Sequence, residues 1–486
     1  MDQPVNFSQS VSSAFSDRSD GPPIAMTAAD HAWLRMDTAT NPMIINSVLI
    51  FSQPIAVDTW RQLIKERFLS FQRFRCAADR GGYWRPQVLD LEAHTPVVSG
   101  KHCHGPEDLQ TLISDLINKR LPEQMPLWQM VLITDYPYRD PKQPNKVSTG
   151  SAIFFRIHHS YADGMALIKV LLGITDEGFA FKPKMQPQAS ANPDSPSSLT
   201  RQLLKQSMHW GQQLTSALTQ KESWWQALDI SQDLIQELML LSLAPTEKNL
   251  FKQDGLCGRK QVVWSEPLHL AEVKTIAKSQ RAKVNDVLLS SVAGALRRYA
   301  KDMNQLTSWS EIRTTVPVNL RDNVDHGEAE GLGNLFGLVF LSLPIGIADP
   351  IERAHLLNER MQALKNSKQA WLVYRLLQLA GSMPDMVEHE LIRLFSSKAS
   401  AVMTNVPGPQ VRLHFGGSPL EQIMFWVPQG GSIGMGVSVF TYNNHVQFGL
   451  MTDEHTIDNP QPVIDCFNRE FEDLLLETLM TARWPG

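Results

Sequence analysis

The distribution of apolar and polar positions along the chain predicts alternating strands and helices. Unbroken apolar runs at 43–51 and 152–157 are typical of buried strands, whereas apolar residues three and four positions apart at 57–68 are typical of an amphipathic helix. The elements expected before residue 183 are helices at 27–37, 57–68 and 109–120, strands at 43–51, 128–134 and 152–157, and paired strands around Gly81 and Gly82. The stretch 136–146, with prolines and mixed charges, predicts an exposed loop. This alternation implies a layered α/β domain.

A second pattern of the same kind begins at residue 255. The elements expected there are strands at 261–265, 311–317 and 335–343, helices at 268–279 and 284–300, and two late strands joined at Asn443 and Asn444. Between the two patterns, 183–200 is rich in Pro and Ser and predicts a linker. The chain therefore divides into a flexible leader at 1–26, a first half at 27–182, the linker at 183–200, connecting helices at 201–254 and a second half at 255–486. The connecting helices either pack on the core or touch lipid.

Composition narrows the class of protein. The chain has 486 residues, of which 43% are hydrophobic and 20% charged, and its formal net charge is −5. This composition is that of a soluble globular protein, and the length favours two or more domains. Nucleic acid is not an expected partner, because the charge balance gives no basic footprint for phosphates.

The cysteines and the chain start predict a reducing compartment. The four cysteines are widely scattered, without CxxC pairs or zinc-like spacing, at Cys76, Cys103, Cys257 and Cys466. We therefore expect no disulfide framework and no metal site, and a cytoplasmic location. His102, Cys103 and His104 have no second pair of ligands nearby and predict a surface loop. The first residues lack the features of a signal peptide, and no apolar run is long enough to span a membrane.

The sequence HHSYADG at 158–164 carries the candidate chemistry. It follows the apolar run at 152–157 and precedes an apolar-periodic run at 165–172, which predicts strand, turn and helix. Successive side chains on a strand point to opposite faces, so His158 and His159 should point in opposite directions. A histidine can transfer protons near neutral pH, and a nearby carboxylate such as Asp163 can orient it or brace its loop. The alternative is a buried histidine, a solvated one and a helix cap at Asp163.

A second motif predicts a different enzyme class, but its context does not support it. Residues 430–434 satisfy G-x-S-x-G, the serine-hydrolase nucleophile elbow, which requires a strand before it and a helix after it. The residues that follow Gly434 are β-branched and aromatic and predict a strand. We therefore interpret 430–434 as a turn between strands.

HHSYADG fits HHxxxDG, the active-site motif of acyltransferases with the chloramphenicol-acetyltransferase-like fold. Within that superfamily the chain resembles the bacterial bifunctional wax ester synthase/acyl-CoA:diacylglycerol acyltransferase family. The matching segments occur in the family's order: MDTATNPM at 36–43, PLWQM at 126–130, HHSYADG at 158–164, NDVLL at 285–289, PVNLR at 317–321 and NVPGP at 405–409. One segment alone would be a weak signal, but the ordered set is specific.

The resemblance implies an α/β fold of two layered halves, with the active site and a substrate tunnel at their interface. It implies an O-acyltransferase that moves a long-chain acyl group from acyl-CoA to a fatty alcohol, to diacylglycerol, or to both. Acyl-CoA is then a substrate, no cofactor is expected, and an activated thioester requires a base rather than a covalent acyl-enzyme. Water-insoluble acceptors imply peripheral contact with the inner membrane or lipid inclusions.

The resemblance also implies roles for particular residues. His159 is the expected general base, with His158 supporting the turn and Asp163 serving as a structural ion-pair partner, for which Arg73, Arg75 and Arg321 are the candidates. The residues expected to support the site are Gly164, Asn285, Asp286 and Arg321. Those expected along the substrate channel are Pro126, Leu127, Trp128, Asn405, Pro407 and Gly408.

Several of these residues could instead have a purely structural role. Trp128 could be an aromatic packed in the core. Helix capping could explain Asn285 or Asp286. The proline and glycine of 405–409 predict a loop, which the resemblance makes a crossover between the two halves.

Two alternative functions belong to other classes. One is a condensation-type, amide-forming enzyme that takes its donor from a carrier protein. The other is a non-catalytic lipid-binding protein with the same fold. The intact HHxxxDG motif disfavours the second, and the other matching segments disfavour the first.

Overall fold

The computed structural model describes residues 22–122, 125–140, 143–180, 243–307, 310–321, 333–381, 383 and 385–481. Most of the predicted leader, the predicted linker at 183–200, most of the predicted connecting helices and residues 322–332 lie outside these residues. The described residues up to 179 and from 245 belong to one compact unit, and the site lies within it.

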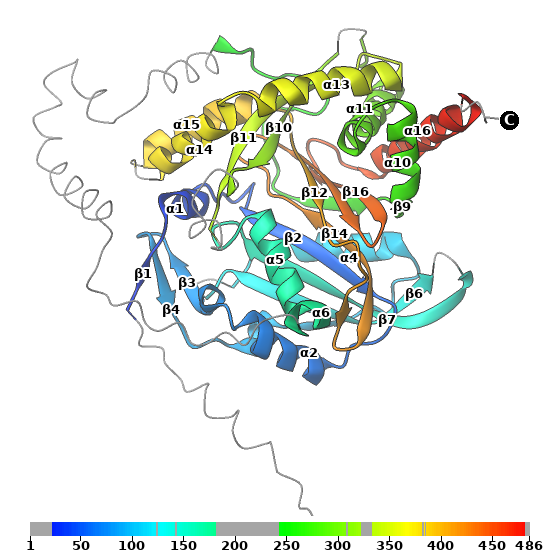
Figure 1. The fold of residues 1–486 in the computed structure, drawn as a ribbon. Helices are drawn as coiled ribbons and strands as arrows, with labels where there is room; N and C mark the ends of the chain where they lie inside the picture. Colours follow the sequence, from blue (N-terminus) through cyan, green and yellow to red (C-terminus); the bar gives the residue numbers. More distant parts are fainter. Residues whose placement is uncertain are drawn as a thin grey trace, which may run out of the picture. The chain divides into compact units, whose positions relative to one another are not determined.

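The first sheet has the strand order β13-β14-β2-β7-β6-β5 (Figure 1). Its strands are β2 (Ile44–Phe51), β5 (Val97–Ser99), β6 (Trp128–Asp140), β7 (Gln143–His158), β13 (His414–Phe415) and β14 (Ser418–Trp426). Its helices are α2 (Val57–Leu63), which continues as a π-helical turn (Ile64–Phe68), α3 (Leu91–His94), α4 (Pro106–Ile117), α5 (Gly164–Ile174) and α6 (Asp176–Ala180). Both faces of the sheet are covered, which explains the unbroken apolar runs.

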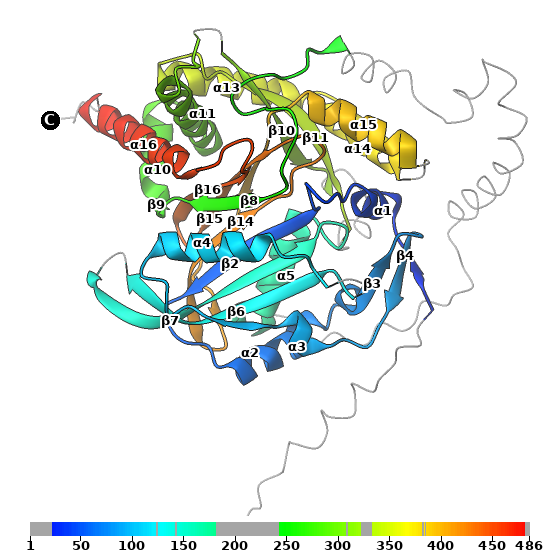
Figure 2. The ribbon, with the colours of Figure 1, turned by 180° about the vertical axis from the view of Figure 1, so that it is seen from behind.

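The two faces of this sheet pack against different partners. Ile45 and Leu49 of β2 pack with residues of α2 and α5, whereas Val48 and Ile50 pack with α4 and with strand β8 of the second sheet. Figure 2 shows α4 on the side opposite α5. The side chains of β2 therefore alternate between two cores.

The prediction of an exposed loop at 136–146 is wrong. Strands β6 and β7 remain paired as far as Asp140 and Gln143, with Tyr136 opposite Gly150 and Tyr138 opposite Ser148. Both tyrosines are buried. The pairing register shifts between Ile133 and Tyr136, where Asp135 has a φ of 57°. The local composition is that of a loop, but the partner strand supplies the pairing.

The second sheet has the order β11-β10-β12-β15-β16-β8, with β9 paired beside β16. Its strands are β8 (Lys260–Trp264), β9 (Leu268–His269), β10 (Ile312–Asn319), β11 (Phe336–Leu343), β12 (Ala401–Pro407), β15 (Met435–Tyr442) and β16 (His445–Asp453). Its helices are α10 (Leu270–Ser279), α11 (Val284–Asp302), α13 (Pro350–Lys365), α14 (Gln369–Ala380), α15 (Asp385–Ser397) and α16 (Gln461–Thr481). The largest core of the described chain lies between this sheet and α10, α11, α13 and α16.

The chain crosses between the sheets after β12. Strand β14, which follows, belongs to the first sheet and pairs antiparallel with β2, so that Met424 lies opposite Val48. The chain then returns to β15, which pairs with β12. The predicted crossover at 405–409 is confirmed, although Asn405 to Pro407 belong to a strand rather than to a loop. The second half at 255–486 thus supplies two strands of the first sheet.

The segments at the start of each half agree only in part with the expected elements. The helix at 27–37 is confirmed as α1 (Ala28–Arg35), which Thr27 caps. The strands around Gly82 are β3 (Cys76–Asp79) and β4 (Tyr83–Pro86), preceded by a 3-10 turn (Gln72–Arg75). Strand β1 (Ile24–Ala25) pairs with β4, so the last residues of the predicted leader form part of a sheet. Residues 245–254 contain no helix. Among the described residues, no helix is long and apolar enough to cross a membrane.

Candidate active site

The HHSYADG segment forms the predicted strand, turn and helix. Strand β7 ends at His158, and α5 begins at Gly164. The Asp163 side chain caps α5, because its Oδ1 accepts a hydrogen bond of 2.9 Å from the backbone N–H of Ala166. The backbone N–H of His159 donates to the carbonyl of Met43, at 2.7 Å, which joins the turn to β2.

The two histidines have different surroundings, as the strand alternation predicts. His159 lines a cavity, whereas His158 does not. The Nδ1 of His158 lies 2.9 Å from Ser160 Oγ, and its Nε2 lies 3.5 Å from Asp37. Asp37 also accepts a hydrogen bond of 2.6 Å from the backbone N–H of Met43. His158 therefore braces the turn.

The hydrogen bonds around Asn334 define the tautomer of His159. The Asn334 amide nitrogen donates to Asp30 Oδ1, at 2.8 Å, and to the carbonyl of His159, at 2.9 Å. The amide oxygen therefore faces His159 Nδ1, at 2.8 Å, and this nitrogen must carry the hydrogen of the neutral ring. No hydrogen-bond partner of Nε2 occurs among the described residues. It remains free to accept a proton.

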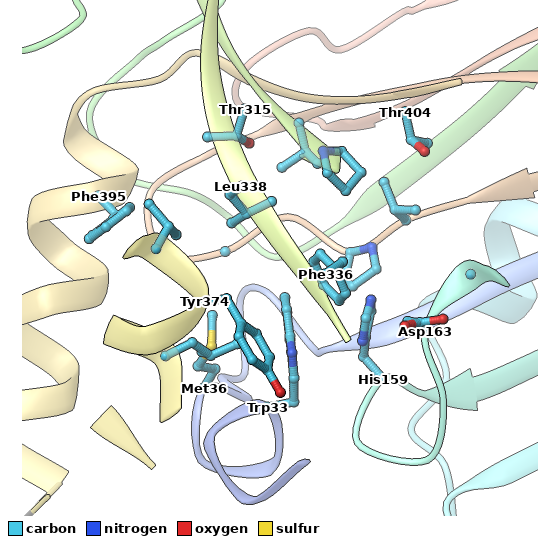
Figure 3. Close-up of a pocket in the computed structure, with 18 of the residues that line it drawn as sticks. Trp33, Met36, His159, Asp163, Thr315, Phe336, Leu338, Tyr374, Phe395 and Thr404 are labelled. Atoms are coloured by element: carbon cyan, nitrogen blue, oxygen red, sulfur yellow. The ribbon is translucent and has the colours of Figure 1, made fainter. Parts of the chain in front are cut away.

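Aromatic rings hold the imidazole in a dry environment. Trp33 stacks on His159, with the ring centroids 4.1 Å apart, and Phe336 lies 5.5 Å away (Figure 3). Burial lowers the pKa of His159 to about 4, although the Asp163 carboxylate and the hydrogen bond to Asn334 act in the opposite direction. The ring is therefore neutral at physiological pH.

Arg321 is the arginine that pairs with Asp163. Its Nη1 lies 2.7 Å from Asp163 Oδ2, which also accepts a hydrogen bond of 3.1 Å from the backbone N–H of Leu335. Both members of the pair are buried. Asp163 is therefore held by two donors and caps a helix, which fits a structural role better than proton transfer.

The other two candidate arginines lie elsewhere. Arg73 Nη1 donates to Asp30 Oδ2, at 3.2 Å, and to the carbonyl of Tyr161, at 3.0 Å. Arg75 is exposed. Arg73 thus supports the Asp30 carboxylate, which in turn orients Asn334.

A cavity of about 440 Å³ lies in front of His159, within the usual range for small-molecule sites. Its walls come from α1, β10, β11, α14, α15, β12 and the segment after β14, so both sheets contribute. Most lining side chains are apolar, and Figure 3 shows Leu338, Phe336, Tyr374, Phe395 and Met36 around the opening in front of the imidazole. The cavity suits an aliphatic ligand.

A second, smaller cavity of about 80 Å³ lies between α5 and the first sheet. Its lining includes Leu167, Ile168 and Leu171 of α5 and is almost wholly apolar. Gly164, Val406 and Phe425 line both cavities, so the two cavities adjoin at these residues.

The predicted channel residues divide into two groups. Asn405 and Pro407 line the main cavity. A Cβ atom at Gly408 would lie 2.4 Å from the Phe440 ring and 2.5 Å from the carbonyl of Thr441, so glycine permits this strand to approach its neighbour. Gly408 does not itself line the cavity.

The prediction that Pro126, Leu127 and Trp128 line the channel is wrong. Trp128 is fully buried, donates its indole hydrogen to the carbonyl of Phe74 and packs on the edge of Phe68. The backbone N–H of Leu127 donates to the Tyr161 hydroxyl, at 3.0 Å, and its carbonyl accepts from His158, at 2.8 Å. This segment supports the HHSYADG turn from behind.

Asn285 and Asp286 do not reach His159. Asp286 caps α11 by accepting a hydrogen bond of 3.0 Å from the backbone N–H of Lys283, and it also binds Asn358. Asn285 Oδ1 accepts a hydrogen bond of 2.7 Å from Asn405, which lines the cavity. Capping thus explains Asp286, and Asn285 orients a wall residue.

Three residues of the site were missed by the sequence analysis: Asp30, Trp33 and Asn334. Trp33 and Asp30 lie on the predicted helix at 27–37, and Asn334 immediately precedes the predicted strand at 335–343. No local pattern marks them, because their partners are distant along the chain. The described residues contain no cluster of three or more metal-ligating side chains.

Comparison with solved structures identifies the fold. The wax ester synthase/diacylglycerol acyltransferase of Marinobacter aquaeolei VT8 has a TM-score of 0.63 and 19% identity, covering 94% of this chain and 100% of that one. The first condensation domain of the calcium-dependent antibiotic synthetase has a TM-score of 0.58 and 14% identity, covering 95% and 97%. The fold is therefore the two-lobed, chloramphenicol-acetyltransferase-like fold.

Sequence comparison identifies the family. The model of the wax ester synthase/diacylglycerol acyltransferase catalytic domain matches residues 26–288, and that of the C-terminal domain of the same family matches residues 332–475. A putative diacylglycerol O-acyltransferase of Mycobacterium tuberculosis is 25% identical over 88% of this chain and 86% of its own. The chain belongs to the wax ester synthase/diacylglycerol acyltransferase family, and it is an acyltransferase.

Proposed function

We propose that this enzyme transfers a long-chain acyl group from acyl-CoA to a fatty alcohol or to diacylglycerol, with His159 as the general base. The observation that carries the proposal is the tautomer of His159. Asn334 holds the hydrogen on Nδ1, and the unprotonated Nε2 belongs to a neutral ring at the wall of an apolar cavity. This is the protonation state that a base requires.

The reaction then needs one proton transfer in each direction. His159 Nε2 takes the hydroxyl proton as the alcohol oxygen attacks the thioester carbonyl carbon. The tetrahedral intermediate collapses, the carbon–sulfur bond breaks, and the thiolate of CoA accepts the proton from Nε2. The Asp163–Arg321 pair and Asn334 hold the ring in place throughout, and no cofactor takes part.

A covalent acyl-enzyme is not part of this proposal. Ser432, the serine of the G-x-S-x-G match, lies in a turn before strand β15, and its hydroxyl contacts Lys252 and Ser396. The helix that a nucleophile elbow requires is replaced by a strand. The predicted turn is confirmed.

The two cavities support long aliphatic substrates. The main cavity receives the reacting groups beside His159, and the smaller apolar cavity, which adjoins it at Gly164, Val406 and Phe425, receives the end of an alkyl chain. Burial of a chain in such surfaces contributes about 0.8 kcal/mol per methylene group. Because these substrates dissolve in lipid, we propose peripheral contact with a membrane or lipid inclusion inside the cell.

Release of free CoA from palmitoyl-CoA by the purified protein tests this function, with 1-hexadecanol or a diacylglycerol as acceptor. We expect acceptor-dependent release and formation of the ester. No ester with either acceptor would contradict the proposal, and product formation only with an amine acceptor or a carrier-bound donor would favour condensation chemistry.

A further inference from the structure

A buried carboxylate lies in the wall of the otherwise apolar main cavity. Among the described residues, the acidic, basic and imidazole side chains in this wall are His159, Asp163, Arg321 and Glu388. Asp163 and Arg321 bind each other, and His159 binds Asn334. Glu388, which is only 2% exposed, has no part in this arrangement.

Glu388 occupies the cavity-facing side of helix α15. Leu391, Ile392 and Phe395, which lie three, four and seven positions later, line the same cavity. The helix therefore presents an apolar face that a single carboxylate interrupts. An aliphatic side chain there would avoid the cost of removing a carboxylate from water.

Glu388 forms an ion pair with Arg35 but accepts no hydrogen bond that meets the geometric criteria. Arg35 Nη2 lies 2.6 Å from Glu388 Oε2, and the N–H group is not aligned with the oxygen. In the described part of the chain, both carboxylate oxygens of Glu388 lack a hydrogen-bond partner, as do Nε and Nη2 of Arg35. Buried acceptors without a donor are destabilising unless a bound ligand supplies one.

Arg35 contacts a second carboxylate of α15 besides Glu388. Arg35 also pairs with Asp385, at 3.0 Å, in the first turn of α15, and this pair already joins α1 to α15. Burial raises the pKa of Glu388 to about 7, although Arg35 acts to lower it. A carboxyl group with such a pKa can be protonated or ionised near neutral pH, so it can donate or accept a hydrogen bond.

We propose that Glu388 is a polar subsite of the substrate cavity, where it binds a hydroxyl or amide N–H group of the substrate other than the reacting hydroxyl. This inference rests on the proposed function and extends it to acceptors that carry a second hydroxyl group. The acyl acceptor supplies the donor if it carries a second hydroxyl, as a monoacylglycerol or a long-chain diol does. Acyl-CoA supplies it through the amides of pantetheine.

Steady-state kinetics of the full chain separate these two sources. The variants Glu388→Leu and Glu388→Met remove the hydrogen-bond acceptor, whereas Glu388→Gln keeps one oxygen that can accept a hydrogen bond. Glu390→Leu is the matched control, because this residue lies on the same helix with its side chain 62% exposed. The substrates are palmitoyl-CoA with 1-hexadecanol, 1,2-hexadecanediol or 1-monopalmitoylglycerol.

We expect kcat/KM of the apolar variants to fall roughly 10- to 100-fold for one substrate, because KM for that substrate rises. This is the range expected for the loss of a hydrogen bond to a charged group. A pantetheine contact raises KM for palmitoyl-CoA with every acceptor. A contact with the acceptor removes a preference for hydroxylated acceptors and leaves KM for palmitoyl-CoA unchanged. Glu388→Gln should retain most of the wild-type KM, and Glu390→Leu should match the wild type.

The proposal of a subsite is contradicted if a folded apolar variant keeps both the wild-type KM for palmitoyl-CoA and the wild-type ranking of acyl acceptors. A loss confined to kcat also overturns it, because that result indicates a structural effect on His159. Melting temperatures show whether each variant is folded. One folded apolar variant, Glu388→Leu or Glu388→Met, is enough for the test. If the wild type forms no ester at all, the proposed function fails instead.

Discussion

The Arg321 guanidinium lies 2.7 Å from the Asp163 carboxylate and joins the two lobes at the active site. Asp163 ends the turn that follows β7 of the first sheet, and Arg321 follows β10 of the second sheet. The pair is buried, so each charge depends on the other for compensation.

Replacing Arg321 by Met should destabilise the fold by about 3–5 kcal/mol, because it leaves the Asp163 carboxylate buried without its partner. The free energy of unfolding in urea measures this loss. Arg393→Met is the control, since Arg393 pairs with Glu390 at the surface and such pairs contribute about 0–1 kcal/mol. The double variant Asp163→Asn with Arg321→Met should be more stable than Arg321→Met alone. Equal stability of the two would contradict an uncompensated charge as the cause.

Replacing His159 by Ala should lower turnover by roughly 10²- to 10⁴-fold, the contribution of a positioned general base. Acceptor-dependent release of CoA measures this effect. His104→Ala should behave as the wild type, because His104 is exposed and does not line the cavity. Wild-type turnover in folded His159→Ala would show that another group removes the proton.

Replacing Asn334 by Ala should lower kcat/KM by roughly 10- to 100-fold, since a lost buried hydrogen bond costs about 1–3 kcal/mol. The expected cause is loss of the preferred His159 tautomer. Asn334→Asp should instead raise the pKa of His159, because it places a carboxylate against Nδ1. The pH profiles of both variants distinguish this effect from a general loss of folding. An unchanged profile in active Asn334→Asp would argue against direct coupling.

The acid limb of the pH profile should report His159. Only the neutral ring accepts a proton, so activity is lost when the pH falls below the pKa of His159 in the folded enzyme. Burial lowers this pKa from the usual 6.5 to about 4. We therefore expect kcat/KM to stay level between neutral pH and about pH 5 and to fall near pH 4, at pH values where fluorescence shows that the enzyme remains folded. An acid limb near pH 6.5 would mean that water reaches the imidazole.

Filling the smaller cavity should shorten the preferred acyl chain. Ile168 lines this cavity from α5, and Ile168→Phe adds volume there. Each methylene group that no longer enters the cavity loses about 0.8 kcal/mol of burial, roughly fourfold in kcat/KM. A series of acyl-CoA substrates measures the shift. Lys169→Met, at the exposed neighbouring position, should leave chain preference unchanged. An unaltered preference in Ile168→Phe would show that the chain lies elsewhere.

The central part of the site could be predicted from sequence because its geometry is local. The apolar run before His158 predicts a strand, and the strand alternation separates the surroundings of His158 and His159. The cap at Asp163 depends on residues within one turn of helix. Each of these features follows from neighbours along the chain.

Other predictions failed where distant contacts decide the outcome. The composition of 136–146 is that of a loop, yet pairing between β6 and β7 continues through it. Trp128 packs against Phe74 and Phe68 behind the site, although its segment was expected to line the channel.

By itself, the sequence determined many of the strands and helices and placed His158 and His159 between a strand and a helix, because periodicity and turn chemistry act over a few residues. Only the tertiary structure decided which arginine binds Asp163, that Asn334 directs His159, and that Glu388 interrupts an apolar wall. Asn334 lies 175 positions from His159 along the chain. Such pairs meet only when the two sheets pack, so no local pattern specifies them.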